Sequence, residues 1–93
     1  MKYIRVAWNH APDDRDDSPV LIYSELDSER NEIRKIHVFS DGRVEYASAE
    51  GGTSNTDLSE TAIPELEEIA SDPVFSPSEI TREEFEALWA KRG

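Results

Sequence analysis

Residues 32–46 read EIRKIHVFSDGRVEY, which is the pattern of two β-strands joined by a tight turn. Asp41-Gly42 marks the turn, because tight hairpin turns require positive backbone φ angles that this pair adopts easily. β-Branched and aromatic residues flank the turn on both sides, as is typical of strands. We therefore expect a hairpin with strands over residues 32–39 and 44–48.

The first strand of this hairpin has an irregular apolar pattern. Ile33 and Phe39 fall on one parity, whereas Ile36 and Val38 fall on the other. Side chains alternate between the two faces of a sheet, so a single buried face does not explain this pattern. Either a β-bulge shifts the register, or both faces of the sheet are partly covered.

Two further strands precede the hairpin. Residues 2–9 place Ile4, Val6 and Trp8 on one face, which we expect to be the core side. Residues 20–26 read VLIYSEL, a composition that suits a strand buried on both faces. Four sequential strands with mostly short connections predict an antiparallel meander.

The second half of the chain predicts helices. Residues 62–70 indicate a short helix with Pro64 near its first position. Thr81 and Glu84 have the spacing of a capping box, which predicts a second helix from residue 82 to about residue 92. Gly51-Gly52 is expected in a flexible connection, and residues 78–80 are expected to be extended. The predicted fold is α+β, a single domain over residues 1–93. It consists of a four-stranded antiparallel meander sheet with a short helix and a longer C-terminal helix packed on one face.

Composition restricts the classes of partner. The chain has 93 residues, of which 21 are Asp or Glu and 10 are Lys or Arg, giving a net charge of −11. Such a charge repels the phosphates of nucleic acids and anionic membrane surfaces, so we expect neither as a direct partner. The chain has no Cys, and its first residues do not form the apolar block of a signal peptide. These features predict a cytoplasmic protein.

One polar segment carries a cluster of acids around Arg15. A cluster of carboxylates suggests a divalent cation, but the spacing lacks the alternating ligands, central Gly and distal Glu of a calcium loop. We therefore expect an exposed loop that faces a protein partner, with no metal and no cofactor. The acids are Asp13, Asp14, Asp16 and Asp17.

The two histidines, His10 and His37, lack the surroundings of a catalytic site in the sequence. Neither lies near a Gly-framed serine, a zinc-type His pair or a phosphate-binding Gly loop. We expect His10 at the end of a strand and His37 on the sheet surface. An alternative hypothesis assigns Arg34 and His37 to a ligand face of the sheet.

The distribution of charge carries more information than any motif. Residues 44–81 contain nine acids and no Lys or Arg, whereas basic residues gather around the third strand. The acids Glu65, Glu67 and Glu68 of the short helix join the Asp loop as candidate contacts for a basic protein. An acidic field of this kind accelerates docking onto such a partner. A second reading is that the acids only maintain solubility.

Several segments resemble a family of small, uncharacterised bacterial single-domain proteins. They are the Trp-ending first strand, LIYSELD at 21–27, EIRKI at 32–36, DGR at 41–43 and ITREEFEALW at 80–89. The resemblance covers nearly the whole chain and implies no catalytic residue. It implies an association with toxin immunity.

Three hypotheses of function follow. The first is a non-enzymatic, immunity-type inhibitor that places an acidic surface over a basic toxin or nuclease. The second is a small-molecule-binding or enzymatic domain that uses the sheet face near Arg34 and His37. The third is a self-associating structural module, because an open sheet leaves edge strands that pair between copies. The sequence leaves the oligomeric state open.

Overall fold

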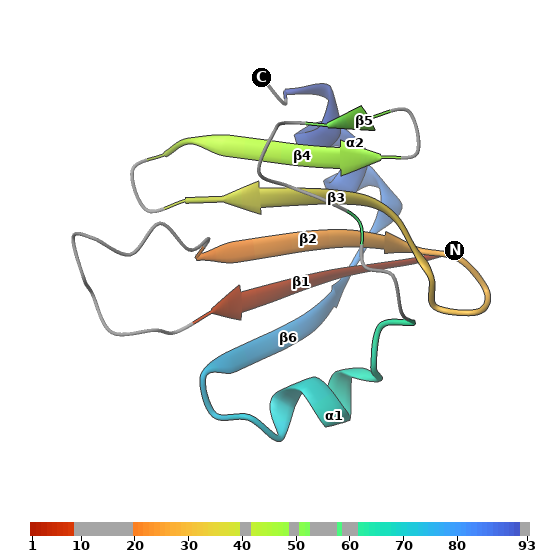
Figure 1. Cartoon of the computed structure of the whole chain (residues 1–93), viewed down its shortest axis with the longest axis vertical. Helices are drawn as coiled ribbons and strands as arrows, with labels where there is room; N and C mark the ends of the chain where they lie inside the picture. Colours follow the sequence, from red (N-terminus) through yellow and green to blue (C-terminus); the bar gives the residue numbers. More distant parts are fainter. Residues whose placement is uncertain (9–19, 40–41, 49–50, 53–57, 59–61, 92–93) are drawn as a thin grey trace.

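The computed structural model describes residues 1–8, 20–39, 42–48, 51–52, 58 and 62–91. Within these residues, six strands form one antiparallel sheet that is flanked by two helices (Figure 1). The strands are β1 (Lys2–Trp8), β2 (Leu21–Leu26), β3 (Glu32–Val38), β4 (Val44–Ser48), β5 (Gly51–Gly52) and β6 (Phe75–Ile80). The helices are α1 (Leu66–Ala70) and α2 (Arg82–Ala90). The α+β class and the antiparallel sheet are confirmed.

The sheet has the strand order β5-β4-β3-β2-β1-β6. The predicted meander is present as β1 to β4, but the prediction of four strands is wrong. The glycines expected in a flexible connection form the two-residue strand β5, which pairs with Ala47 and Ser48. The strand β6 adds to the free edge of β1, from Tyr3 opposite Ile80 to Trp8 opposite Phe75.

The sequence of β6 explains why it is hard to recognise. Its residues read FSPSEI and include Pro77 and two serines, so they lack the apolar alternation of a half-buried strand. Proline is tolerated on an edge strand because one side of that strand faces no partner strand. Only the last three residues of β6 were expected to be extended.

The hairpin between β3 and β4 forms as predicted. The amide of Phe39 donates to the carbonyl of Arg43 at 2.9 Å, and Gly42 has a φ of +90°. Asp41 lies outside the described residues. The irregular pattern of β3 arises from both of the causes considered. The register with β2 shifts between Glu25 and Leu26, and both faces of the sheet are covered.

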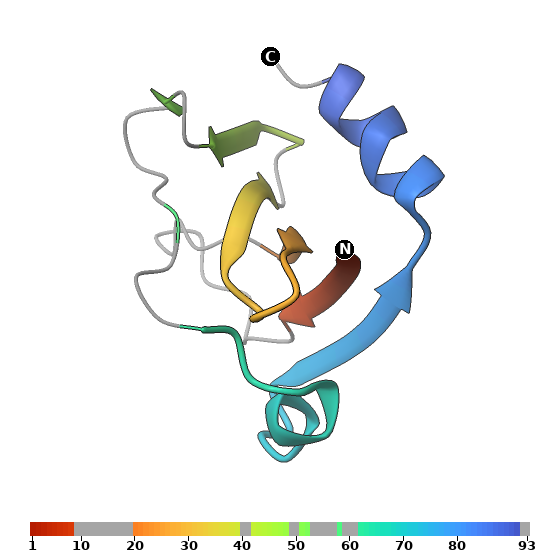
Figure 2. The ribbon, with the colours of Figure 1, turned by 90° about the vertical axis from the view of Figure 1, so that its right-hand side faces the viewer.

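Two apolar clusters lie on opposite faces of the sheet. On one face, Tyr3, Tyr23 and Ile36 pack against Phe85 of α2. On the other face, Ile4, Val6 and Leu26 pack with Leu66 and Ile69, which belong to α1. Figure 2 shows α2 on one side of the sheet and the segment leading into α1 on the other. The expectation that both helices pack on one face is therefore wrong.

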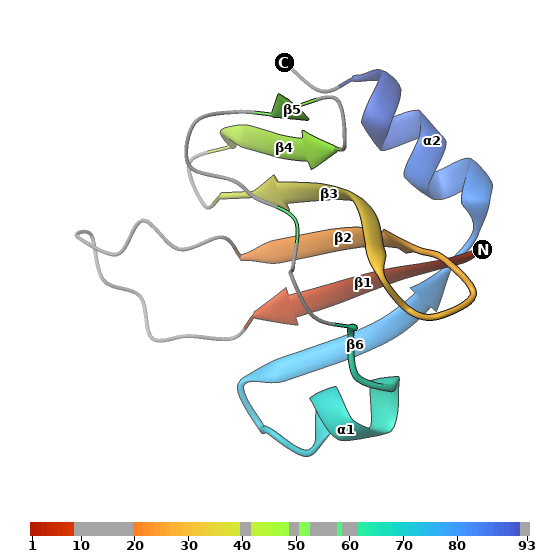
Figure 3. The same ribbon diagram turned by 45° about the vertical axis from the view of Figure 1, so that its right-hand side comes forward.

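The first strand shows the physical reason for this difference. Tyr3, Ile4 and Val6 are all buried, with exposed fractions of 7%, 2% and 7%. We expected one core face for β1, but β1 lies between β2 and β6 and contributes to both clusters. Both faces of the sheet must therefore be covered. α2 covers one of these faces (Figure 3).

Both helices differ slightly from their predicted bounds. α1 begins at Leu66 rather than at residue 62, because Glu65 is extended. The segment before it pairs with the turn after β2, where the amide of Ile63 donates to the carbonyl of Arg30. α2 begins as predicted, with Thr81 Oγ1 accepting from the amide of Glu84 at 3.1 Å. It ends at Ala90, and it is the longer helix, as expected.

Candidate functional site

The three carboxylates predicted on the short helix all lie on its exposed surface. Glu67 and Glu68 stand in the first turn of α1, and Glu65 immediately precedes the helix. Leu66 and Ile69 of the same element pack on the sheet, which leaves the acids toward solvent. We call Glu65, Glu67 and Glu68 the α1 acids. The structure brings these three predicted residues together.

Arg30 contacts the segment that leads into α1 and the first of the α1 acids, Glu65. Its Nε donates to the carbonyl of Ile63 at 2.7 Å, and one terminal nitrogen donates to the carbonyl of Pro64 at 2.6 Å. The other terminal nitrogen lies 3.4 Å from Glu65 Oε2. Arg30 also has a φ of +66°, which is uncommon for a residue with a side chain. The turn between β2 and β3 is thereby fastened to the segment that begins α1.

Two further acids extend this surface. Asp72 follows α1 and Glu79 lies in β6, and both are exposed. The side chain of Asp72 accepts from the amide of Val74 at 3.1 Å, which shapes the connection to β6. Both acids belong to the segment of residues 44–81 that contains acids and no Lys or Arg. The other predicted acidic contacts, Asp13, Asp14, Asp16 and Asp17, lie outside the described residues.

The basic residues around β3 are paired with acids of the same chain. Arg30 contacts Glu65, Arg34 contacts Glu25 and Glu86, Lys35 lies 3.0 Å from Glu32, and Arg43 lies 3.4 Å from Glu45. Three of these acids, Glu25, Glu32 and Glu45, are buried. The basic patch predicted near the third strand is therefore largely neutralised inside the fold.

Arg34 forms the most extensive of these pairs. Its Nε lies 2.5 Å from Glu25 Oε1, and a terminal nitrogen donates to Glu25 Oε2 at 2.8 Å and also to Glu86. The guanidinium lies 5.0 Å from the ring centres of both Phe85 and Trp89. These contacts join β2 and β3 to α2.

The Glu25 carboxylate accepts three hydrogen bonds from two partners. Tyr3 donates its hydroxyl to Glu25 Oε2 at 2.7 Å, in addition to the two bonds from Arg34. The hydrogen bonds from Arg34 lower the pKa of Glu25 despite the opposing effect of burial. Burial and the bond to Glu25 raise the pKa of Tyr3. Sequence reasoning missed Glu25, because only the strand register brings it opposite Arg34.

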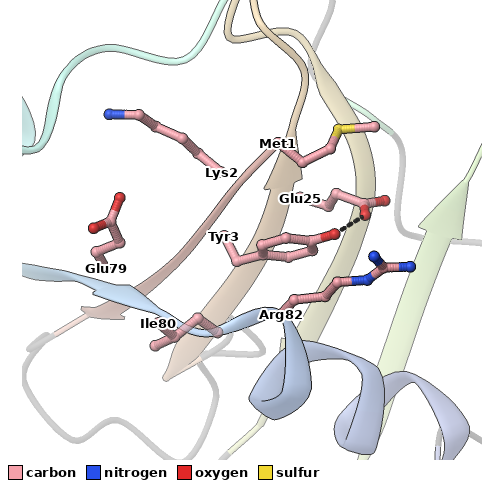
Figure 4. A pocket seen from close by; sticks show the side chains of 7 residues that line it. All are labelled: Met1, Lys2, Tyr3, Glu25, Glu79, Ile80 and Arg82. Atoms are coloured by element: carbon pink, nitrogen blue, oxygen red, sulfur yellow. Dashed lines mark hydrogen bonds between the residues drawn. The ribbon is translucent and has the colours of Figure 1, made fainter.

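A hollow of about 600 Å³ lies beside this carboxylate at the end of the sheet. Tyr3, Glu25 and Arg82 lie to one side of it, and Lys2 and Glu79 point to the other (Figure 4). Its lining contains both acidic and basic side chains. The carboxylate of Glu25 already accepts three hydrogen bonds, one from Tyr3 and two from Arg34, so its role in this hollow is structural.

Arg34 and His37 are not brought together. Arg34 lies over Phe85 on the α2 face, whereas His37 lines a hollow on the opposite face with Ile4 and Ile63. His37 is half-buried, and burial together with the charge of Lys35 lowers its pKa. The lowered pKa favours the neutral form of the imidazole. A ligand face that uses both side chains is not formed.

Neither a metal cluster nor a membrane-spanning helix occurs in the described part of the chain. No group of three or more His, Asp and Glu side chains lies there in a position to hold a metal ion. No helix formed by those residues has the length and apolar character needed to cross a membrane.

Comparisons with known proteins give one match. Residues 2–93 match the family described as "Domain of unknown function (DUF6881)". No curated protein and no solved structure matches the chain. The match agrees with the resemblance to a small uncharacterised family, and it carries no link to toxin immunity.

Proposed function

The chain belongs to the DUF6881 family of domains of unknown function, and from this premise we propose that it is a non-enzymatic binding protein that docks an acidic surface on a basic protein. The surface consists of the α1 acids, extended by Asp72 and Glu79. We expect the partner to be a basic toxin or nuclease, with the chain acting as its immunity-type inhibitor.

One observation carries the proposal. The α1 acids are exposed, whereas the basic residues of β3 and its flanking turns are paired with acids of the same chain. Internal pairing reduces the positive field around β3. The pair of Arg30 with Glu65 neutralises one of the α1 acids, so the docking charge rests mainly on Glu67 and Glu68. The chain has a net charge of −11, and the α1 acids, Asp72 and Glu79 are among the described acids that face solvent. Complementary fields of this kind raise association rates between proteins by about 10- to 1000-fold at low salt.

The attachment of α1 also supports a docking role. A short helix of five residues is not stable by itself in water, so its shape depends on packing and on the contacts of Arg30. These contacts fix the backbone that leads into the three carboxylates before a partner arrives. A prearranged surface loses less conformational entropy on binding than a mobile one.

The experiment begins with affinity purification of the tagged chain from its native host. Each recovered protein is identified, purified separately, and tested for direct binding by calorimetry at low and high salt. We expect a basic protein that binds with 1:1 stoichiometry and loses affinity as salt is added. Recovery of no direct binding partner, or binding that is indifferent to salt, would contradict the proposal.

A further inference from the structure

A second hollow lies on the sheet face opposite α2, and the α1 acids do not line it. It has a volume of about 260 Å³. Ile4, Val6 and Ile22 of the sheet form its floor, and Ile63, Ile69 and Phe75 form its walls. Ile4 and Val6 are nearly fully buried, so the floor is built from core residues. We call this hollow the His37 pocket.

The polar side of the His37 pocket is built from residues of β2 and β3. Ser24, which is 3% exposed, donates its hydroxyl to Glu32 Oε2 at 2.7 Å. Glu32 Oε1 in turn lies 3.0 Å from Lys35 Nζ. The carboxylate and the ammonium compensate each other, so the pocket does not demand a charged ligand.

His37 is the one polar group of this lining whose hydrogen-bonding atoms lack a partner within the described ranges. Its ring makes an edge contact with Phe39 at 6.3 Å, but neither ring nitrogen forms a hydrogen bond to a described residue. A neutral imidazole offers one N–H donor and one nitrogen acceptor. A ligand with a complementary hydroxyl or N–H group can therefore pair with the imidazole.

The size and lining of the pocket restrict the ligand. Sites for drug-sized ligands usually measure about 300–1000 Å³, so 260 Å³ suits a molecule of one or two rings. The aliphatic floor and the ring of Phe75 favour an aromatic body. We propose that the His37 pocket binds a small neutral aromatic molecule with one hydroxyl or N–H group that bonds to His37. Phenols and indoles are the chemical class.

This binding site goes beyond the proposed function and does not depend on it. The pocket is lined by residues of the sheet and by Ile63, Pro64 and Ile69, whereas the α1 acids are exposed and do not line it. Both can operate in one molecule, because they use different side chains of the same segment.

The test uses the full chain and two probes of similar shape, phenol and toluene. Each is titrated while NMR records the methyl signals of Ile4, Ile22 and Ile69 and the ring signals of His37. We expect saturable shifts confined to the pocket, and tighter binding of phenol by about 2- to 10-fold, the value of one neutral hydrogen bond. Shifts that do not saturate or spread over the surface would overturn the proposal, as would equal affinities for the two probes.

Three variants identify the contacts. His37→Phe keeps an aromatic ring and should abolish the preference for phenol, while His37→Gln should retain part of it. Ile69→Trp, at the wall contributed by α1, should fill the pocket and abolish binding of both probes. If Ile69→Trp binds phenol as the natural chain does, the site lies elsewhere.

A protein partner is the competing occupant. If neither probe binds but a purified partner protects the pocket residues from exchange, the hollow belongs to a protein interface and the small-ligand proposal is wrong. The titrations with phenol and toluene do not depend on the acidic surface, because the probes are uncharged and no partner is present.

Discussion

Arg30 and Ile63 are joined in both directions although 33 residues separate them in the sequence. The Arg30 guanidinium donates to the carbonyl of Ile63, and the amide of Ile63 donates to the carbonyl of Arg30 at 2.8 Å. The turn after β2 is thereby locked to the segment that leads into α1. This pair fixes the position of the α1 acids, so the acidic surface depends on a basic residue.

Replacing Arg30 should therefore release α1. Arg30→Ala removes two hydrogen bonds from a charged donor, and we expect a loss of about 1–3 kcal/mol in the free energy of unfolding. Amide hydrogen exchange at Glu68 and Ile69 should accelerate more than exchange in β2. Arg5→Ala removes the same charge from an exposed position of β1 and serves as the control. Equal effects of the two variants would show that charge, not the contact with Ile63, is what matters.

The pair of Glu25 and Arg34 should behave as a buried ion pair. Arg34→Met keeps much of the apolar contact with Phe85 and Trp89 but leaves the Glu25 carboxylate buried without its main partner. Removing one partner of such a pair costs about 3–5 kcal/mol. The double variant Arg34→Met with Glu25→Gln should recover much of this loss, as measured by urea unfolding. A double variant as unstable as Arg34→Met would contradict this account of Glu25.

His37 should make stability depend on pH in a defined window. Its pKa in the folded chain lies below the ordinary value, so the unfolded chain takes up a proton first as pH falls. The contribution of His37 to stability is present above about pH 6.5 and is lost as pH falls through its folded pKa. Unfolding of His37→Gln, followed from pH 8 to pH 5.5, should show a smaller loss than the natural chain. Parallel curves would show that burial of His37 does not contribute.

Gly42 should be required for its backbone conformation alone. It has a φ of +90°, and no heavy atom lies within 4 Å of the position that a Cβ would take. Gly42→Ala therefore meets no steric clash with the rest of the fold, and its cost should be the backbone penalty of about 1–2 kcal/mol. Thermal unfolding measures it. Gly42→Asn should lose less, because Asn tolerates positive φ better than Ala; the reverse order would contradict this account.

Local patterns in the sequence predicted the elements that depend on neighbours in the chain. The hairpin at Gly42 and the helix start at Thr81 depend on backbone conformations a few residues long. The strand β6 was not predicted in full, because Pro77 and the two serines do not form an apolar alternation. These residues are extended because they pair with β1, which is far away in the sequence. Both faces of β1 are apolar or aromatic near Tyr3 and Ile4, and only the placement of α1 and α2 decides that both are buried.

Some features of the candidate site could be predicted from the sequence, and others depend on contacts between distant segments. The exposure of the α1 acids follows from the apolar spacing of Leu66 and Ile69, so the sequence could predict it. The pairing of Arg34 with Glu25 depends on the register between β2 and β3 and is not visible in the sequence. For the same reason, the separation of Arg34 and His37 onto opposite faces was not foreseen, although three residues along a regular strand reverse the face.

The most direct test of the acidic surface compares two pairs of acids in equivalent positions. Glu67 and Glu68 lie in the first turn of α1, and Glu83 and Glu84 lie in the first turn of α2. The variant E67Q/E68Q and the control E83Q/E84Q lose the same charge with the same change of shape. Stopped-flow measurement with the purified partner at low salt gives the association rate constant of each. We predict that E67Q/E68Q slows association about tenfold while the control stays close to the natural chain. Equal rate constants for the two variants would contradict the claim that the α1 acids form the docking surface.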